Sequence, residues 1–267
     1  VPPGPVSPME LGIRGRRALV FGGSRGLGRA AALALAREGV EVTIAARNRK
    51  TLFAAAAQLT RESGCHVMPV IADLTRSEGR AAALDACPAP DILINNADGP
   101  APGNFRDWTR NTWVETLDSV MLGPIMMMQA VLDGMIARRG GRIINVSSRT
   151  VKSPQSELGL SNGSRAALIG FVAGLARETV KHNVTINNIL PGIFDSDAQK
   201  QHIRGMVAMT GKSFEQMWEE RARATPAGRY GSVGEFGSYC AFLCSAQAGY
   251  ITGQNLLIDG GAYPGTF

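Results

Sequence analysis

The chain has few of the residues that bind metals or form disulfide bonds. It contains three histidines and four cysteines, Cys65, Cys87, Cys240 and Cys244. No pair of cysteines has CxxC spacing, and no histidine-rich stretch has the spacing of metal ligands. Because Cys240 and Cys244 lie one helical turn apart, we interpret them as buried thiols. We expect neither a metal site nor a disulfide framework.

Long apolar runs and clustered basic residues are also missing. No unbroken apolar stretch is long enough to span a membrane, and no basic segment followed by an apolar one marks a secretion signal. The net charge is +6, but the arginines are scattered and no basic run is interleaved with aromatic residues. We therefore expect a cytoplasmic protein that binds neither a membrane nor nucleic acid.

The length of 267 residues suits one large α/β domain, and no shift in composition marks a boundary. The first nine residues, VPPGPVSPM, hold four of the 14 prolines and have no periodicity. We predict a flexible leader over residues 1–11 and a single domain over residues 12–267.

Short apolar runs recur along the domain, with helical patterns between them. They cover residues 18–21, 40–45, 67–71, 92–95, 142–146, 185–190 and 255–258. This alternation predicts a doubly wound Rossmann domain, in which helices cover both faces of a parallel seven-stranded sheet. Ligands of such sheets bind beyond the carboxyl ends of the strands.

The segment RALVFGGSRGLGRAAALALAREG, residues 17–39, has the order strand, glycine-rich turn, helix. Its glycines allow a tight turn, a close approach to a pyrophosphate, and close packing of the helix on the strand. The free N–H groups of the helix N-terminus would face the phosphates. The turn residues predicted to bind a dinucleotide are Gly22, Ser24, Arg25, Gly26, Leu27 and Gly28.

Charged residues after the next two strands indicate which dinucleotide binds. Arg47, followed by Asn48, stands where the adenosine ribose is recognised, and an arginine there suits a 2′-phosphate. Arg25 adds a second cation nearby, so the sequence favours NADPH over NADH. Beyond the third strand, Asp73 and Leu74 place a carboxylate where it could accept from the adenine amino group.

Four motifs together identify a family. They are FGGSRGLG at 21–28, NNAD at 95–98, PGIFDSD at 191–197, and TGQ with DGG at 252–254 and 259–261. With them the chain resembles the short-chain dehydrogenase/reductase family from Arg17 to Gly261. The resemblance implies an NAD(P)-binding Rossmann domain, a homotetramer as the default assembly, and further cofactor contacts from Asn96, Ala97, Asp98, Pro191, Gly192, Ile193 and Ser196.

The resemblance also implies a catalytic tetrad, of which only the serine is present, as Ser148. Val120 stands where the family has a helical asparagine, and the YxxxK motif is replaced by Ser161 and Arg165. Because Ser148 and Ser161 keep the family's spacing of thirteen positions, a register error does not explain the change. We predict a catalytic centre of Ser148, Ser161 and Arg165, with Arg165 also holding the cofactor.

These replacements alter how a proton could reach the substrate. A serine hydroxyl is a much weaker acid than a phenol, and an arginine stays charged, so Ser161 and Arg165 are poor at proton transfer. Three routes stay open: a water held by the three predicted catalytic residues, a donor among Lys152, His202 and Tyr230, or a substrate that needs little protonation.

Two further expectations concern the rim of the site. Asp98 replaces a family glycine, and because an unpaired carboxylate is costly to desolvate, we expect it within ion-pair reach of Arg149 or Arg165. Residues 198–225 are expected to form a substrate lid. Its Met206, Met209, Phe214, Met217 and Trp218 suggest a partly apolar substrate, although ordinary packing of these side chains is the alternative.

The sequence therefore predicts an NADPH-dependent oxidoreductase of the carbonyl reductase type, which transfers a hydride to the ketone of a small molecule. The alternative is a catalytically silent NADPH-binding sensor or scaffold, because three members of the tetrad are replaced and such losses normally reduce rates by orders of magnitude.

Overall fold

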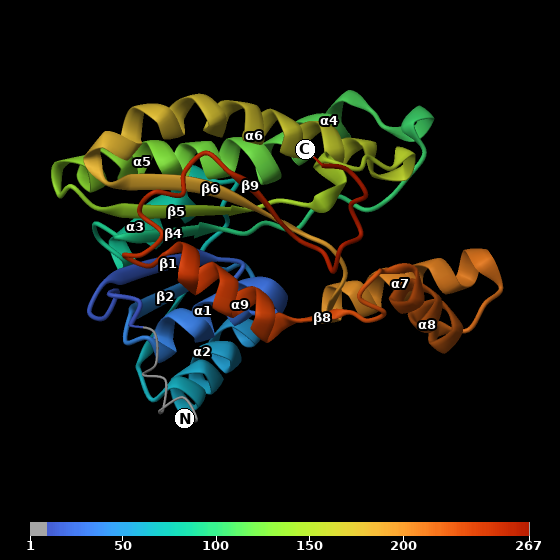
Figure 1. Ribbon diagram of the computed structural model, residues 1–267, viewed down its shortest axis with the longest axis horizontal. Coiled ribbons are helices and arrows are strands. Elements are labelled where there is room, and N and C mark those ends of the chain that lie inside the picture. The colour runs from blue at the N-terminus through green and yellow to red at the C-terminus, as the bar shows by residue number, and fades with distance from the viewer. Residues whose placement is uncertain (1–9, 267) are drawn as a thin grey trace, which may run out of the picture.

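Seven parallel strands form one sheet in the computed structural model, which describes residues 10–266 (Figure 1). Their order is β3-β2-β1-β4-β5-β6-β9. The strands are β1 (Arg17–Phe21), β2 (Glu41–Ala46), β3 (Val67–Ile71), β4 (Ile92–Asn95), β5 (Gly141–Val146), β6 (Val184–Pro191) and β9 (Asn255–Ile258). Each predicted apolar run is one of these strands, so the doubly wound Rossmann fold is confirmed.

Helices cover both faces of this sheet and bury two apolar clusters. On one face lie α1 (Gly26–Arg37), α2 (Arg49–Ser63) and α9 (Val233–Leu243), and on the other α3 (Ser77–Ala86), α5 (Gly123–Ala137) and α6 (Gly159–Thr179). The strands contribute to both clusters because successive side chains of a strand point to opposite faces. Cys240 and Cys244, predicted to be buried thiols, are free and lie in the first cluster.

One long helix is interrupted by a π-helical turn. Helix α4 (Arg110–Leu117) continues through a π-helical turn, η2 (Asp118–Leu122), into α5. Within residues 10–266, Arg110–Ala137 is the one helix that is long and apolar enough to cross a membrane by length and composition. Met127, Met128 and Met135 of this helix are completely buried in the second cluster, so part of its apolar composition serves core packing.

A pair of helices projects from the sheet at the expected lid (Figure 1). They are α7 (Asp197–Thr210) and α8 (Phe214–Ala224), which lie between the two short strands β7 (Phe194–Asp195) and β8 (Gly231–Ser232). The ring of Trp218 stacks on Phe214 and on Tyr230, at centroid distances of 5.7 and 3.8 Å. The pair therefore has a small apolar core of its own.

The start of the described chain is attached to the domain. Leu11 packs against the first apolar cluster, and its carbonyl accepts a hydrogen bond of 2.9 Å from the Ala246 N–H. Most of the predicted leader, residues 1–9, lies outside the described residues.

Candidate active site

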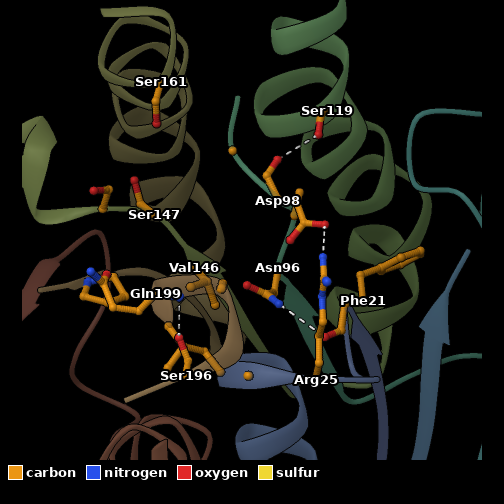
Figure 2. Close-up of a pocket in the computed structure, with 18 of the residues that line it drawn as sticks. Phe21, Arg25, Asn96, Asp98, Ser119, Val146, Ser147, Ser161, Ser196 and Gln199 are labelled. Carbon is orange, nitrogen blue, oxygen red and sulfur yellow. Dashed lines mark hydrogen bonds and ion pairs between the residues drawn. The ribbon is translucent and has the colours of Figure 1, made fainter. Parts of the chain in front are cut away.

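A cavity of about 600 Å³ opens at the carboxyl ends of the central strands. It extends from the glycine-rich turn to the lid helices, and Figure 2 shows side chains from both halves pointing into it. Its lining includes all the predicted site residues except Gly28: Gly22, Ser24, Arg25, Gly26, Leu27, Arg47, Asn48, Asp73, Leu74, Asn96, Ala97, Asp98, Ser148, Ser161, Arg165, Pro191, Gly192, Ile193 and Ser196.

Gly28 lies behind the cavity wall, where its lack of a side chain lets α1 pack closely. A Cβ atom there would collide with the Gly22 carbonyl oxygen and lie 2.7 Å from Asn96 Nδ2. Gly22 itself has a φ of +64°, a left-handed conformation that favours glycine. Gly28 thus shapes the turn through packing.

The N-terminus of α1 has room for an anion. Arg25 occupies the N-cap without a capping side-chain hydrogen bond, and the first turn has no acidic residue. The first N–H groups of the helix are therefore available to a pyrophosphate, and the positive end of the helix dipole favours it. The residues present fit a dinucleotide.

Asp98 pairs with the two arginines predicted to recognise a 2′-phosphate. Its Oδ2 lies 3.0 Å from Arg25 Nη2 and 3.4 Å from Arg47 Nη2 (Figure 2 shows the first pair). The predicted pairing with Arg149 or Arg165 is therefore wrong. The physical reason is that the Asp98 side chain points toward the glycine-rich turn, where two cations already lie.

Two other predicted cofactor residues take part in local hydrogen bonds. Asp73 Oδ1 accepts from both the N–H and the hydroxyl of Thr75, at 3.0 and 2.8 Å. Although partial burial raises the pKa of the Asp73 carboxyl, these bonds and nearby Arg47 hold it below its ordinary value. Asn48 caps α2 by accepting from the Thr51 N–H at 3.0 Å.

Arg165 lies deep in the cavity wall, only 7% exposed. Its Nε donates to the Ser161 hydroxyl oxygen at 3.1 Å, its Nη1 to the Val146 carbonyl at 2.8 Å, and its Nη2 to the Ala97 carbonyl at 3.4 Å. Burial lowers the pKa of Arg165 to about 10, and the charge of Asp98 partly opposes that shift. The guanidinium therefore remains charged at neutral pH and is oriented by three neutral acceptors.

The same cavity is lined by Ser147, Ser148 and Ser161, and of these Ser161 contacts the guanidinium. Ser148 Oγ is 2.9 Å from Thr150 Oγ1 and accepts from the Thr150 N–H at 3.2 Å. Ser147, which sequence reasoning missed, also lines the cavity, and its buried hydroxyl has no hydrogen-bond partner among the described residues. Figure 2 shows Ser147 and Ser161 directed into the same part of the cavity. The sequence signal that could have identified Ser147 was its position next to Ser148, just after β5.

The position of the family asparagine carries no polar group in this chain. Val120 lies in the π-helical turn η2 and is 2% exposed. Its neighbour Ser119 lines the cavity instead, and its hydroxyl donates to the Asp98 carbonyl at 3.4 Å. The sequence signal for Ser119 was only its position next to Val120.

Of the three alternative proton donors, the structure places only His202 in the cavity lining. Lys152 lies over the ring of Tyr263 at 5.5 Å, and Tyr230 is buried under Trp218. Burial, followed by the charge of Arg221, lowers the pKa of His202 below its ordinary value. His202 is therefore mainly neutral at pH 7.

The lid presents polar side chains to the cavity. Ala198, Gln199 and His202 of α7 and Arg221 of α8 line it, whereas Phe214, Met217 and Trp218 do not. The expectation that these three provide an apolar substrate face is wrong, because they pack into the apolar core of the lid. The alternative of ordinary packing holds for them. The side chains of Met206 and Met209 lie outside the described set.

The sequence is similar to known oxidoreductases over nearly its whole length. The family model described as enoyl-(acyl carrier protein) reductase matches residues 22–263. The chain is 33% identical to the 3-oxoacyl-[acyl-carrier-protein] reductase FabG of Vibrio harveyi, over 95% of this chain and 99% of that protein. It is 30% identical to the gluconate 5-dehydrogenase of Gluconobacter oxydans, over 95% and 97% of the two chains.

A similar solved structure is that of L-sorbose reductase from Gluconobacter frateurii, complexed with NADPH and L-sorbose. It is 28% identical, has a TM-score of 0.91, and covers 96% of this chain and 100% of its own. The glycine-rich turn, the seven-stranded sheet and these matches along nearly the whole length lead to one conclusion. The chain belongs to the short-chain dehydrogenase/reductase family of oxidoreductases.

Proposed function

We propose that this protein is a cytoplasmic, NADPH-dependent carbonyl reductase that reduces the ketone of a small molecule with a Ser148, Ser161 and Arg165 centre. The observation that carries the proposal is the buried Arg165 guanidinium, which donates to the Ser161 hydroxyl oxygen at 3.1 Å in the cavity wall. Named relatives support it: FabG is a 3-oxoacyl reductase, and L-sorbose reductase was solved with NADPH.

The adenosine half of the cavity would hold the cofactor by charge and by backbone N–H groups. The N-terminus of α1 would hold the pyrophosphate, Arg25 and Arg47 would bind the 2′-phosphate, and Asp73 would accept from the adenine. At the other end, the segment from Pro191 to Ser196 would hold the nicotinamide. When bound, NADPH supplies the hydride that adds to the carbonyl carbon.

The protein stabilises the negative charge that develops on the carbonyl oxygen. Because Arg165 donates to Ser161 Oγ, the Ser161 proton is left to donate toward the substrate, and Ser148 offers a second hydroxyl. The guanidinium stabilises the developing alkoxide through this hydrogen bond, and the burial of Arg165 strengthens the interaction. In this proposal, water in the cavity supplies the proton that completes the alcohol.

Turnover of NADPH with a panel of ketones tests the proposal. We expect NADPH to bind, as measured by its fluorescence, and its absorbance to fall in the presence of some ketones. Arg165→Ala should lower kcat about 100- to 1,000-fold, the range for removing a preorganised oxyanion donor. Arg165→Lys, which retains a cation, should lose less.

The same panel tests the silent alternative. That alternative is favoured by the buried Val120 at the family asparagine position, because a valine side chain makes none of the hydrogen bonds of an asparagine. NADPH binding without oxidation by any ketone would support a sensor or scaffold. Equal turnover by wild type and Arg165→Ala would remove Arg165 from the mechanism.

We also propose that the protein forms a homotetramer. Leu122, Met126 and Phe171 are each about 40% exposed on the surface of η2, α5 and α6, and they offer apolar area for contact between copies. Sedimentation equilibrium should show four chains per particle, and a monomer would contradict this assembly.

A further inference from the structure

We propose that the carbonyl substrate carries an oxyanion, a carboxylate or a phosphate, and that Arg149 binds it. The inference rests on the proposed reductase activity and adds its substrate class. It comes from the lid end of the cavity, which we call the cationic lobe, lined by Arg149, Gln155, Gln199, His202 and Arg221.

Arg149 is placed to contact a ligand. It follows Ser148 directly and opens the short 3-10 helix η3 (Arg149–Val151). Its side chain lines the cavity, is half-buried, and forms no hydrogen bond or ion pair with any residue between 10 and 266. A cation that has lost part of its hydration without gaining an anionic partner is stabilised when an anion binds beside it.

The charges around the cavity are distributed unevenly. Its lining contains two carboxylates, Asp73 and Asp98, which both lie in the adenosine half, and Asp98 is already paired there. The cationic lobe has Arg149 from one wall and Arg221 from the other. Glu157 is close enough to act on the charge of His202, but it does not line the cavity.

A buried donor in the cationic lobe also lacks an acceptor. Gln199 Nε2 is inaccessible to solvent and has no hydrogen-bond partner among the described residues. Such a group costs free energy unless an oxygen is supplied to it. A neutral polyol could supply that oxygen, but it would leave the charge of Arg149 without an anionic partner, whereas an oxyanion supplies both.

The test compares ketones that differ only in charge. We would measure kcat/KM with NADPH for 3-oxobutanoate, 4-oxopentanoate and 5-oxohexanoate, each against its amide. Dihydroxyacetone phosphate against dihydroxyacetone distinguishes a phosphate from a carboxylate. Because a hydrogen bond to a charged group contributes about 1.5–3 kcal/mol, we expect one charged member to be preferred by about 10- to 100-fold.

The variants assign that preference to one side chain. Arg149→Gln should remove the preference for the charged ketone, so that kcat/KM is equal for the charged and the neutral member of a pair. Arg149→Lys should restore part of the preference. The matched control is Arg110→Gln, which makes the same charge change at an exposed residue outside the cavity. Equal kcat/KM for charged and neutral ketones, or a ratio unchanged in Arg149→Gln, would overturn the inference and leave the reductase standing.

A binding measurement separates this inference from the proposed function. If none of these ketones is reduced, the reductase proposal fails for this class of substrate, and the oxyanion site is tested without turnover. Calorimetry of the NADP-loaded protein should then show binding of succinate or inorganic phosphate, lost in Arg149→Gln. No binding of either anion would overturn the inference as well.

Discussion

At the scale of single residues, Asp98 has the clearest consequence. It holds Arg25 and Arg47 with one carboxylate oxygen, and both arginines are also the ones suited to a 2′-phosphate. A phosphate that binds there must compete with Asp98. We therefore expect the charge of Asp98 to weaken binding of the phosphorylated cofactor.

Asp98→Asn should strengthen NADPH binding. All three side chains are more than half exposed, so the gain should be only about two- to fivefold, the range for exposed ion pairs. Fluorescence titration measures it, and NADH should gain less because it lacks the 2′-phosphate. The control is Asp85→Asn, an exposed residue outside the cavity. Weaker NADPH binding in Asp98→Asn would contradict the competition.

The sequence could locate site residues better than it could pair them. Motif spacing predicted that Ser148, Ser161 and Arg165 converge, because Ser148 follows β5, and Ser161 and Arg165 lie in the first turns of α6, the next long helix. The partner predicted for Asp98 was wrong. Arg25, which binds Asp98, is 73 positions away in the sequence, and motif spacing does not show which distant arginine a carboxylate reaches. The direction in which a side chain turns between two neighbouring cations is not encoded in spacing.

At the scale of elements, the sequence predicted the strands but not the π-helical turn η2 between α4 and α5. Apolar runs bounded by polar turns identify buried parallel strands directly. The π-helical turn η2 lies within a continuous apolar helix, where composition does not distinguish it. Its position matters because it places Ser119 in the cavity lining and buries Val120.

Helices α1 and α9 touch where Gly237 has no side chain. A Cβ atom at Gly237 would lie 2.5 Å from the Ala30 carbonyl oxygen, so one helix must move away. Gly237→Ala should lower the free energy of unfolding by about 1–3 kcal/mol, as overpacking does. At Gly174 in α6, an added Cβ atom would have no contact within 4 Å among the described residues. Gly174→Ala should therefore raise the free energy of unfolding by about 0.5–1 kcal/mol. Urea midpoints measure both, and equal shifts would contradict this explanation.

The start of α9 depends on an ionised carboxylate. Glu235 accepts from Arg229 at 2.7 and 2.9 Å and from the Ser232 N–H at 2.7 Å. The bonds from Arg229, followed by that from Ser232, lower the pKa of Glu235 to about 2. Because the folded pKa is lower than the unfolded one, the ionised group stabilises the fold above the ordinary pKa of 4.5.

This stabilisation is lost as the pH falls from 4.5 toward 2. Glu235→Gln should therefore lower Tm at pH 7 and match wild type more closely at the acid end of that interval. Thermal unfolding across this range measures the difference. Glu219→Gln, which breaks the exposed pair with Arg223 within α8, should change Tm little. A constant difference at all pH values would exclude the carboxylate charge as the cause.

At the scale of the whole molecule, two bodies of unequal size meet at the cavity. The Rossmann domain has two extensive apolar clusters, whereas the lid helices share a small one around Ile203, Met217 and Tyr230. A region with so little buried apolar surface opens at a lower free energy than the sheet does.

Trp218→Ala should loosen the lid selectively. Its ring stacks between Phe214 and Tyr230, so its removal takes away most aromatic contact in the lid core. We expect hydrogen exchange in α7 and α8 to become faster by tenfold or more, while exchange in β1, β4 and β5 is unchanged. Trp218→Phe should retain much of the protection. Faster exchange throughout the sheet would show that lid and domain open together.

In the lid helices, the side chains that line the cavity are different from those that form the apolar core of the lid. Gln199, His202 and Arg221 line the cavity and are not members of the apolar core of the lid, so we expect the packing of α7 against α8 to tolerate substitutions there. For protein engineering this means that a combinatorial library at these three positions should yield mostly folded variants. New substrate preferences could then be selected on a scaffold that tolerates the diversity.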